Sequence, residues 1–179
     1  MDTKINVEFF DFIKERKSIR NFIYQKIDDK IIKDILECGR WAPSGRNSQP
    51  WHICVVIHPT VKHMLAENSK YKETIESAYV NLVIFLDLER GYDRVKDLQA
   101  IGAFIENILL AVHAHKELGA VWIGEILNNK ESVNKIFKLP NDKFELMACL
   151  AIGVIDETQR DKSVKPRDRQ SLESFTTWY

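Results

Sequence analysis

The stretch Ala42–Trp51 reads Ala-Pro-Ser-Gly-Arg-Asn-Ser-Gln-Pro-Trp and is the most specific motif of the chain. It holds two prolines, two amides, two hydroxyls and one guanidinium. The β-branched run Trp51–Ile57 follows directly and ends before Pro59, which predicts a polar loop leading into a strand. Prolines hold neighbouring side chains in place at low entropic cost, and amides both donate and accept hydrogen bonds. We interpret the loop as a candidate binding segment; an ordinary polar turn is the alternative.

Hydrophobic periodicity predicts helices on both sides of this loop, together with three further strands. Asp28 is expected to cap the second helix. The continuous apolar run Tyr79–Leu86 is typical of a strand that is covered on both faces. The predicted helices are Asn6–Arg16, one that starts after Asp28, Val61–Glu67, Tyr71–Ser77, Asp97–Leu118 and Glu131–Phe137; the predicted strands are Trp51–Ile57, Tyr79–Leu86, Ala120–Ile126 and Leu146–Ile155.

The helices outnumber the strands and do not alternate with them regularly, so we expect an α+β fold rather than a doubly wound sheet. No linker or internal repeat divides the chain, and we predict one domain over residues 1–179. The middle of the long helix, Ala103–Val112, is apolar nearly all round, which is typical of a core or a subunit interface. Gly119 is expected to end that helix in the left-handed conformation. Residues 156–179 finish with bulky aromatics, so we expect them to dock on a second subunit.

The charge balance and the cysteines restrict the class of protein. Lys plus Arg and Asp plus Glu each number 26, so no overall field attracts nucleic acid or an anionic membrane surface. The longest uncharged stretches reach about ten residues, short of the ~20 that a membrane span needs. The N-terminus lacks a secretory pattern, and Cys38, Cys54 and Cys149 form no Cys-x-x-Cys pair. We expect a reduced, cytoplasmic protein.

Motifs for side-chain catalysis are missing from the sequence. No Gly-x-Gly-x-x-Gly fingerprint, phosphate-binding P-loop or Gly-x-Ser-x-Gly elbow occurs. His113 and His115 lie two residues apart on the predicted long helix, so they point to different faces and no metal site is expected. If the protein is an enzyme, we therefore expect its reactive group to be a bound cofactor.

Two cationic segments and the loop suit flavin mononucleotide (FMN). Arg16–Arg20 reads Arg-Lys-Ser-Ile-Arg, and its forked guanidinium donors and hydroxyl match a phosphate monoester. A solvated basic helix end is the alternative for this segment. Residues 165–167 read Lys-Pro-Arg and suit a phosphate site or a plain surface equally well. Asn47 and Gln49 can contact the edge of a flavin ring, which mixes hydrogen-bond acceptors with one donor.

Taken in order, these motifs resemble the nitroreductase family. The matching blocks are Arg16–Arg20, Pro43-Ser44-x-x-Asn47-x-Gln49-Pro50-Trp51, Gly102-Ala103-x-x-x-Asn107, Gly119-x-x-Trp122-Ile123-Gly124 and Lys165-x-Arg167. They cover nearly the whole chain, and the second block is the most specific. The resemblance implies an α+β flavoprotein with a mixed, mostly antiparallel sheet of four to five strands flanked by helices. It also implies an intertwined homodimer that binds FMN at the subunit interface.

The resemblance also assigns cofactor-binding residues. The implied contacts are Arg16, Lys17, Ser18 and Arg20 with the phosphate, the ribityl chain and one ring edge; Lys165 and Arg167 with the phosphate; Pro43, Ser44, Asn47 and Gln49 from the partner subunit; and Ile123 and Gly124 through backbone groups near the ring. No catalytic side chain and no metal ligand is implied, because the flavin carries the chemistry.

The implied family reaction is a two-step, ping-pong hydride transfer. NADH or NADPH reduces the flavin and leaves, and a nitroaromatic, a quinone or a related acceptor then takes the electrons. Two alternatives stay open: another chemistry of a related branch, such as dehalogenation or flavin modification, and a non-catalytic flavin-binding protein. Only about ten residues, Asp87–Lys96, separate the second predicted strand from the next helix. The helical lid of longer family members is therefore expected to be absent or reduced.

Overall fold

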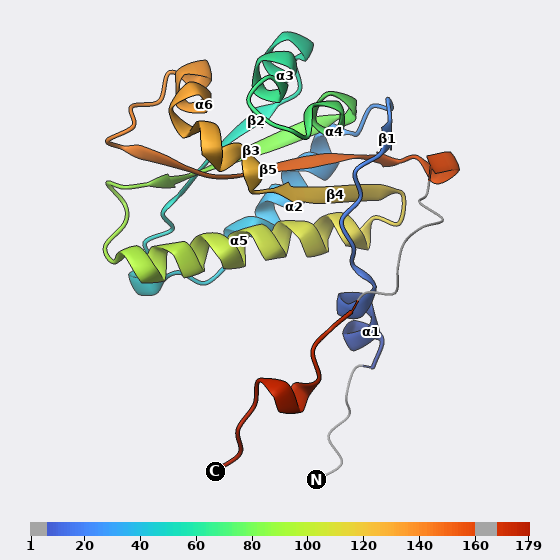
Figure 1. Ribbon diagram of the computed structural model, residues 1–179, viewed down its shortest axis with the longest axis vertical. Helices are drawn as coiled ribbons and strands as arrows, with labels where there is room; N and C mark the ends of the chain where they lie inside the picture. The colour runs from blue at the N-terminus through green and yellow to red at the C-terminus, as the bar shows by residue number, and fades with distance from the viewer. Residues whose placement is uncertain (1–6, 160–167) are drawn as a thin grey trace.

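A five-stranded antiparallel sheet forms the centre of the computed structural model, which describes residues 7–159 and 168–179 (Figure 1). The strands are β1 (Phe22–Ile23), β2 (Trp51–Val56), β3 (Val80–Asp87), β4 (Leu118–Ile123) and β5 (Phe144–Ile155). The longest strand, β5, pairs with β3 along one edge and with β4 along the other, and β2 pairs with β3. The short β1 pairs with the end of β5, beyond the point where β3 starts. The predicted α+β fold with four to five strands is confirmed.

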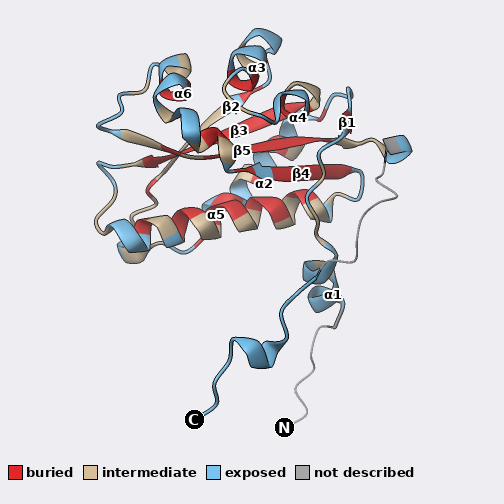
Figure 2. Cartoon of the chain, in the orientation of Figure 1, coloured by how far each residue is buried: buried red, intermediate tan, exposed pale blue. Residues whose placement is uncertain are grey.

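Helices cover both faces of the sheet, α2 and α5 on one face and α3, α4 and α6 on the other (Figure 1). The α-helices are α1 (Val7–Glu15), α2 (Asp29–Arg40), α3 (Pro59–Ala66), α4 (Lys72–Ser77), α5 (Arg94–Ala114) and α6 (Lys130–Phe137); the 3₁₀ helices are η1 (Gly45–Asn47), η2 (Glu125–Asn129), η3 (Glu157–Gln159) and η4 (Leu172–Ser174). Successive residues of β3 alternate between the two layers: Leu82 and Ile84 pack in the α5 layer, and Val83 and Phe85 pack in the other. β3 is thus buried on both faces, as its apolar run predicts (Figure 2).

Side-chain caps start α2 and α5, the two helices that cover the same face of the sheet. Asp28 accepts a hydrogen bond from the Lys30 N–H at 2.7 Å, which confirms the predicted cap of α2. Asp93 caps α5 in the same way by accepting from the Lys96 N–H at 3.1 Å. α5 buries the side that faces the sheet, and its outer side is more exposed (Figure 2).

The prediction for Gly119 is wrong. α5 ends at Ala114, because His115 adopts an extended backbone and donates its N–H to the Val112 carbonyl. Gly119 lies inside β4, where it pairs with Gly153 of β5, and its φ is not in the left-handed region. α5 also starts three residues earlier than predicted, at Arg94, because Asp93 supplies the cap.

The predicted strand Ala120–Ile126 is displaced along the chain. β4 begins at Leu118 and ends at Ile123. Gly124 then takes a right-handed helical conformation, and η2 starts at Glu125. The physical reason is a tertiary contact: the Glu125 carboxylate accepts hydrogen bonds from the Ser69 hydroxyl at 2.8 Å and the Lys70 N–H at 3.0 Å, which turns the chain towards the loop between α3 and α4.

Two segments project from the layered body, α1 and residues 168–179 (Figure 1). Residues 168–179 are exposed throughout, and Trp178 is 93% exposed. Phe9 and Phe10 of α1 are also about half exposed. Large exposed apolar side chains on projecting segments are typical of surfaces that a second molecule covers. Docking of residues 156–179 on a partner stays a prediction.

Candidate functional site

The segment after α1 runs along β4 and carries the first group of predicted site residues. The Ile19 N–H donates to the Ala120 carbonyl at 2.9 Å, which fastens the segment to the strand. The Ile19 side chain lies on Gly119, where an added Cβ would be 2.6 Å from the Ile19 Cβ. Gly119 is thus required for close approach rather than for a turn.

Side chains in this segment point in alternate directions, as in a strand. Lys17 and Ile19 are half-buried, whereas Ser18 and Arg20 are exposed. The Arg16 side chain is 22% exposed, and its Nε lies 3.6 Å from Oε1 of Glu106 on α5. Arg20 therefore does not share a surface with Arg16 and Lys17 in the single chain.

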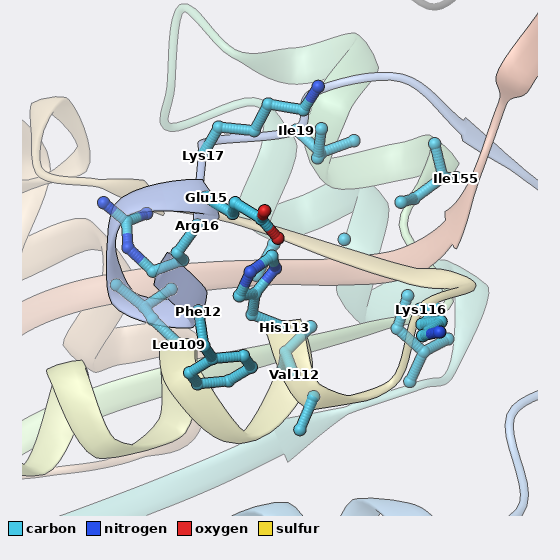
Figure 3. A pocket seen from close by; sticks show the side chains of 14 residues that line it. Phe12, Glu15, Arg16, Lys17, Ile19, Leu109, Val112, His113, Lys116 and Ile155 are labelled. Atoms are coloured by element: carbon cyan, nitrogen blue, oxygen red, sulfur yellow. The ribbon is translucent and has the colours of Figure 1, made fainter. Parts of the chain in front are cut away.

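A cavity of about 330 Å³ lies between the end of α1, this segment and the C-terminal half of α5 (Figure 3). Its volume is within the range of small-molecule sites. Arg16 and Lys17 line it and extend in different directions from the end of α1 (Figure 3). The rings of Phe12 and His113 face each other with centroids 4.8 Å apart. Neither Ser18 nor Arg20 lines this cavity.

A second hollow adjoins Arg16 and adds a cation that the sequence motifs did not single out. It is lined by Ile13, Lys14, Arg16, Glu106 and Arg169. Arg169 comes from the C-terminal segment, and it continues the alternating basic pattern of Lys165 and Arg167. Lys165 and Arg167 themselves lie outside the described residues. That alternation is the sequence signal from which Arg169 was predictable.

The loop between α2 and β2 is tightly folded. Arg46, Asn47 and Gln49 have φ angles of 56°, 54° and 48°, in the left-handed region that disfavours side chains. The Ser44 Oγ accepts from the Gln49 N–H at 3.0 Å, and the Gln49 Nε2 donates to the Asn47 carbonyl at 3.3 Å. Three such residues within four positions indicate a backbone that its surroundings impose, a feature that often accompanies binding sites.

This loop lies against the N-terminal half of α5 (Figure 1). A hollow of about 370 Å³ lies beside this contact; it is lined by Pro43, Ser44, Gly45, Lys96, Gln99, Ala100 and Ala103. The cavity beside Arg16 instead borders residues Leu109 to Ala114. Ala100 and Val112 are twelve residues apart on α5, which corresponds to roughly 18 Å along the axis. Within one chain, the two groups of predicted contacts thus lie at opposite halves of α5.

The end of β4 presents a third group of predicted contacts. Ile123 is buried, whereas Gly124 is exposed and faces open space, since an added Cβ would meet no atom within 4 Å. Hydrogen bonds, first from the Lys70 N–H and then from the Ser69 hydroxyl, lower the pKa of Glu125, which follows directly. These bonds hold the turn in a defined position and leave room beside Gly124.

Within residues 7–159 and 168–179, no three His, Cys, Asp or Glu side chains gather in a way that could hold a metal ion. None of the described helices is both long enough and apolar enough to cross a membrane.

The model of the nitroreductase family matches residues 13–73 and 58–154. A Bacillus subtilis protein named as an NAD(P)H nitroreductase is 32% identical over 179 residues, which cover 89% of this chain and 91% of that protein.

Solved structures are similar over most of the chain. A Desulfovibrio desulfuricans protein named as a nitroreductase, crystallised in complex with FMN, is 33% identical with a TM-score of 0.86, and the match covers 99% of this chain and 98% of that one. The NADPH:FMN oxidoreductase of Vibrio harveyi, complexed with NAD⁺, is 26% identical with a TM-score of 0.78, over 88% of this chain and 72% of that one. This chain therefore belongs to the nitroreductase family.

Proposed function

We propose that this protein is an FMN-dependent oxidoreductase that uses NADH or NADPH to reduce nitroaromatics, quinones or related acceptors in a two-step, ping-pong reaction. The similarity to the FMN complex from Desulfovibrio desulfuricans, which extends over 99% of the chain, is the observation that carries the proposal. The names of the other relatives, an NAD(P)H nitroreductase and an NADPH:FMN oxidoreductase, support the nicotinamide donor.

The separation of the two contact groups along α5 supports a homodimer. A two-fold axis that crosses α5 would bring the N-terminal half of one α5 beside the C-terminal half of the other, because two-fold interfaces pair each surface with its counterpart. The loop Pro43–Gln49 of one chain and the segment Arg16–Arg20 of the other would then contact one FMN. Exposed aromatics on α1 and at the C-terminus, such as Phe9 and Trp178, supply apolar surface for such an assembly.

The residues of the chain fit FMN in charge and in shape. Arg16, Lys17, Ser18 and Arg20, with Lys165 and Arg167, would bind the phosphate and ribityl chain, since guanidinium forks and hydroxyls match phosphate oxygens. Asn47 and Gln49, held by the strained loop with Pro43 and Ser44, would hydrogen-bond the edge of the ring. The open space beside Gly124 would admit the ring next to the backbone of Ile123 and Gly124.

The bound FMN would supply the two-electron chemistry, by accepting a hydride from the donor and passing electrons to the acceptor. The chain's own residues would bind and orient it. Cations fixed before the reaction stabilise negative charge without reorganisation, so they favour the reduced state of the site. No side chain of the chain is assigned as an acid, a base or a nucleophile.

Spectroscopy of the purified, flavin-loaded protein tests this function. Visible absorbance bands typical of flavin are expected, and they should bleach when NADH or NADPH is added without oxygen and return when a quinone is added. The double variant Arg20→Ala/Arg167→Ala should lose at least about tenfold in FMN affinity, because bonds to charged groups contribute about 1.5–3 kcal/mol each. Lys135→Ala, on the exposed side of α6, is the control. Bound flavin that neither nucleotide reduces would contradict the proposal.

A further inference from the structure

The ring of Tyr92 contacts two cations at the edge of the loop Pro43–Gln49. The guanidinium carbon of Arg46 is 4.7 Å from the Tyr92 ring centroid, and Nζ of Lys96 is 5.3 Å from the same centroid. An aromatic face attracts cations at such distances. Arg46 from η1 and Lys96 from α5 are therefore held on one ring, although fifty residues separate them in the sequence.

Tyr92 is held firmly in turn. Its N–H and that of Asp93 both donate to Oδ2 of Asp97, at 2.9 Å and 3.1 Å, and Asp97 is only 4% exposed. The ring also packs on Gly45, where an added Cβ would be 2.1 Å from the Tyr92 hydroxyl oxygen. The short connection from β3 to α5 thus holds the Tyr92 ring in a fixed position. In longer family members this connection could carry a lid.

The two cations are only partly neutralised. Lys96 pairs with Asp93 at 3.6 Å, and the two side chains are 56% and 40% exposed. In the part of the chain that the structure describes, Arg46 takes part in no ion pair. Its forked donors face the ring and solvent rather than a carboxylate, so they are available to an anionic ligand.

Of Arg46, Tyr92 and Lys96, Lys96 alone lines the hollow beside the loop that is proposed to contact the flavin. Lys96 and Gln99 line the 370 Å³ hollow together with Pro43, Ser44 and Gly45. A ligand in the hollow would therefore lie beside the loop proposed to contact the flavin. Among the proposed substrates, quinones and simple nitroaromatics carry no phosphate, whereas both nicotinamide donors do. A cationic rim hence matches the donor rather than the acceptor.

We propose that Arg46 and Lys96 bind a phosphate group of the nicotinamide donor, with Tyr92 as the residue that positions both cations. This inference rests on the proposed function and names the residues that recognise its donor. Arg46 offers two parallel donors to phosphate oxygens, and Lys96 offers a compact charge. The cations act on binding of the donor, and they take no part in the hydride transfer itself.

Donors with and without phosphate test the proposal in the flavin-loaded protein. Flavin reduction is followed with NADH, with NADPH and with uncharged benzyl dihydronicotinamide, for wild type, Arg46→Gln, Lys96→Gln and the double variant. Each single change should lower kcat/KM for NADH and NADPH by about threefold to tenfold, as for partly exposed charge contacts. The value for the uncharged donor should stay within about twofold, and the salt dependence of the NADH reaction should weaken.

Matched variants separate this effect from a general disturbance of the loop. Lys135→Gln removes one charge from exposed α6 on the other face of the sheet and should change none of the three rates. Tyr92→Leu should lower kcat/KM for the phosphate-bearing donors alone. Tyr92→Phe should keep the wild-type values, because the ring face is retained.

The outcomes that overturn the inference differ from those that overturn the proposed function. Equal losses with charged and uncharged donors, or unchanged rates with NADH and NADPH in the double variant, would overturn it. So would a loss of FMN affinity in Arg46→Gln/Lys96→Gln with donor kinetics unaffected, since the cations would then serve the flavin phosphate. Failure of every donor to reduce the wild-type flavin would instead reject the proposed function.

Discussion

The segment Arg16–Arg20 and the loop Pro43–Gln49 carry most of the proposed flavin contacts, yet they are built in opposite ways. The segment is extended, is fastened to β4 by the bond from Ile19 to Ala120, and exposes Ser18 and Arg20. The loop is closed on itself by hydrogen bonds between its own residues and holds three side-chain-bearing residues at positive φ.

This difference separates two ways of preparing a binding site. A rigid loop presents its amides with little ordering cost on binding, whereas long exposed cations must be ordered by the ligand. The two elements also border opposite halves of α5, so within one chain they do not lie beside each other.

Complementation between two defective chains is expected to give the largest effect. Arg20→Ala damages the segment, and Asn47→Ala/Gln49→Ala damages the loop, so each homodimer should bind FMN at least about tenfold more weakly. In a tagged heterodimer with one chain of each kind, one of the two sites would combine an intact segment with an intact loop. Flavin occupancy should therefore recover to about half of the wild-type value at limiting FMN, as measured by absorbance. A heterodimer as weak as its parents would place both elements of each site in the same chain.

Alanine substitutions at Gly119 and Gly124 distinguish a glycine that is needed for packing from one that leaves room for a ligand. Gly119→Ala would force Ile19 and its segment away from β4, so we expect a loss of about 1–3 kcal/mol in unfolding free energy and weaker FMN binding. Gly124→Ala meets no neighbouring atom and should leave the flavin-free protein as stable as wild type, while it weakens FMN binding. Urea unfolding and FMN titration check both. Equal stability losses would show that the space beside Gly124 is filled by the protein itself.

Substitution by glycine at positive φ measures the strain of the loop. Lys138, at the end of α6, and Arg46 share a φ of 56°. Lys138→Gly should stabilise the protein by about 0.5–1 kcal/mol, the relief of left-handed strain less the added freedom of the unfolded chain. Arg46→Gly should gain much less, because it also loses about 0.5–1 kcal/mol of cation–π attraction to Tyr92. Equal gains in urea unfolding would mean that the contact with Tyr92 adds nothing to stability.

The smallest expected effect concerns pH at the turn after β4. Hydrogen bonds from Lys70 and Ser69 lower the pKa of Glu125 below its ordinary value of 4.5 in the folded protein. The ionised carboxylate therefore favours the folded state above pH 4.5, and this contribution disappears as the pH falls through the lowered pKa. The stability difference between wild type and Glu125→Gln should be constant near neutral pH and shrink in acid. A difference that grows in acid would contradict the assigned direction.

Local sequence patterns were sufficient for much of the fold. The cap at Asp28, the strand covered on both faces and the apolar interior of α5 all follow from short-range periodicity and hydrogen-bonding chemistry. Gly119 was misassigned because its neighbour in space, Ile19, is a hundred residues away in the chain. The two-residue β1 carries no pattern of its own and exists only through its pairing with β5.

The residue types of the candidate site were likewise visible in the sequence, since phosphate and flavin chemistry demands cations, hydroxyls and amides in short motifs. Their placement along α5 was not, and neither was the contact of Arg46 and Lys96 with Tyr92. The residue types in a short motif indicate which chemistry a site can carry, whereas the distance between segments depends on how helices and strands pack. The sequence by itself determined which groups this protein offers to a ligand; only the tertiary structure decided which of them meet within one chain.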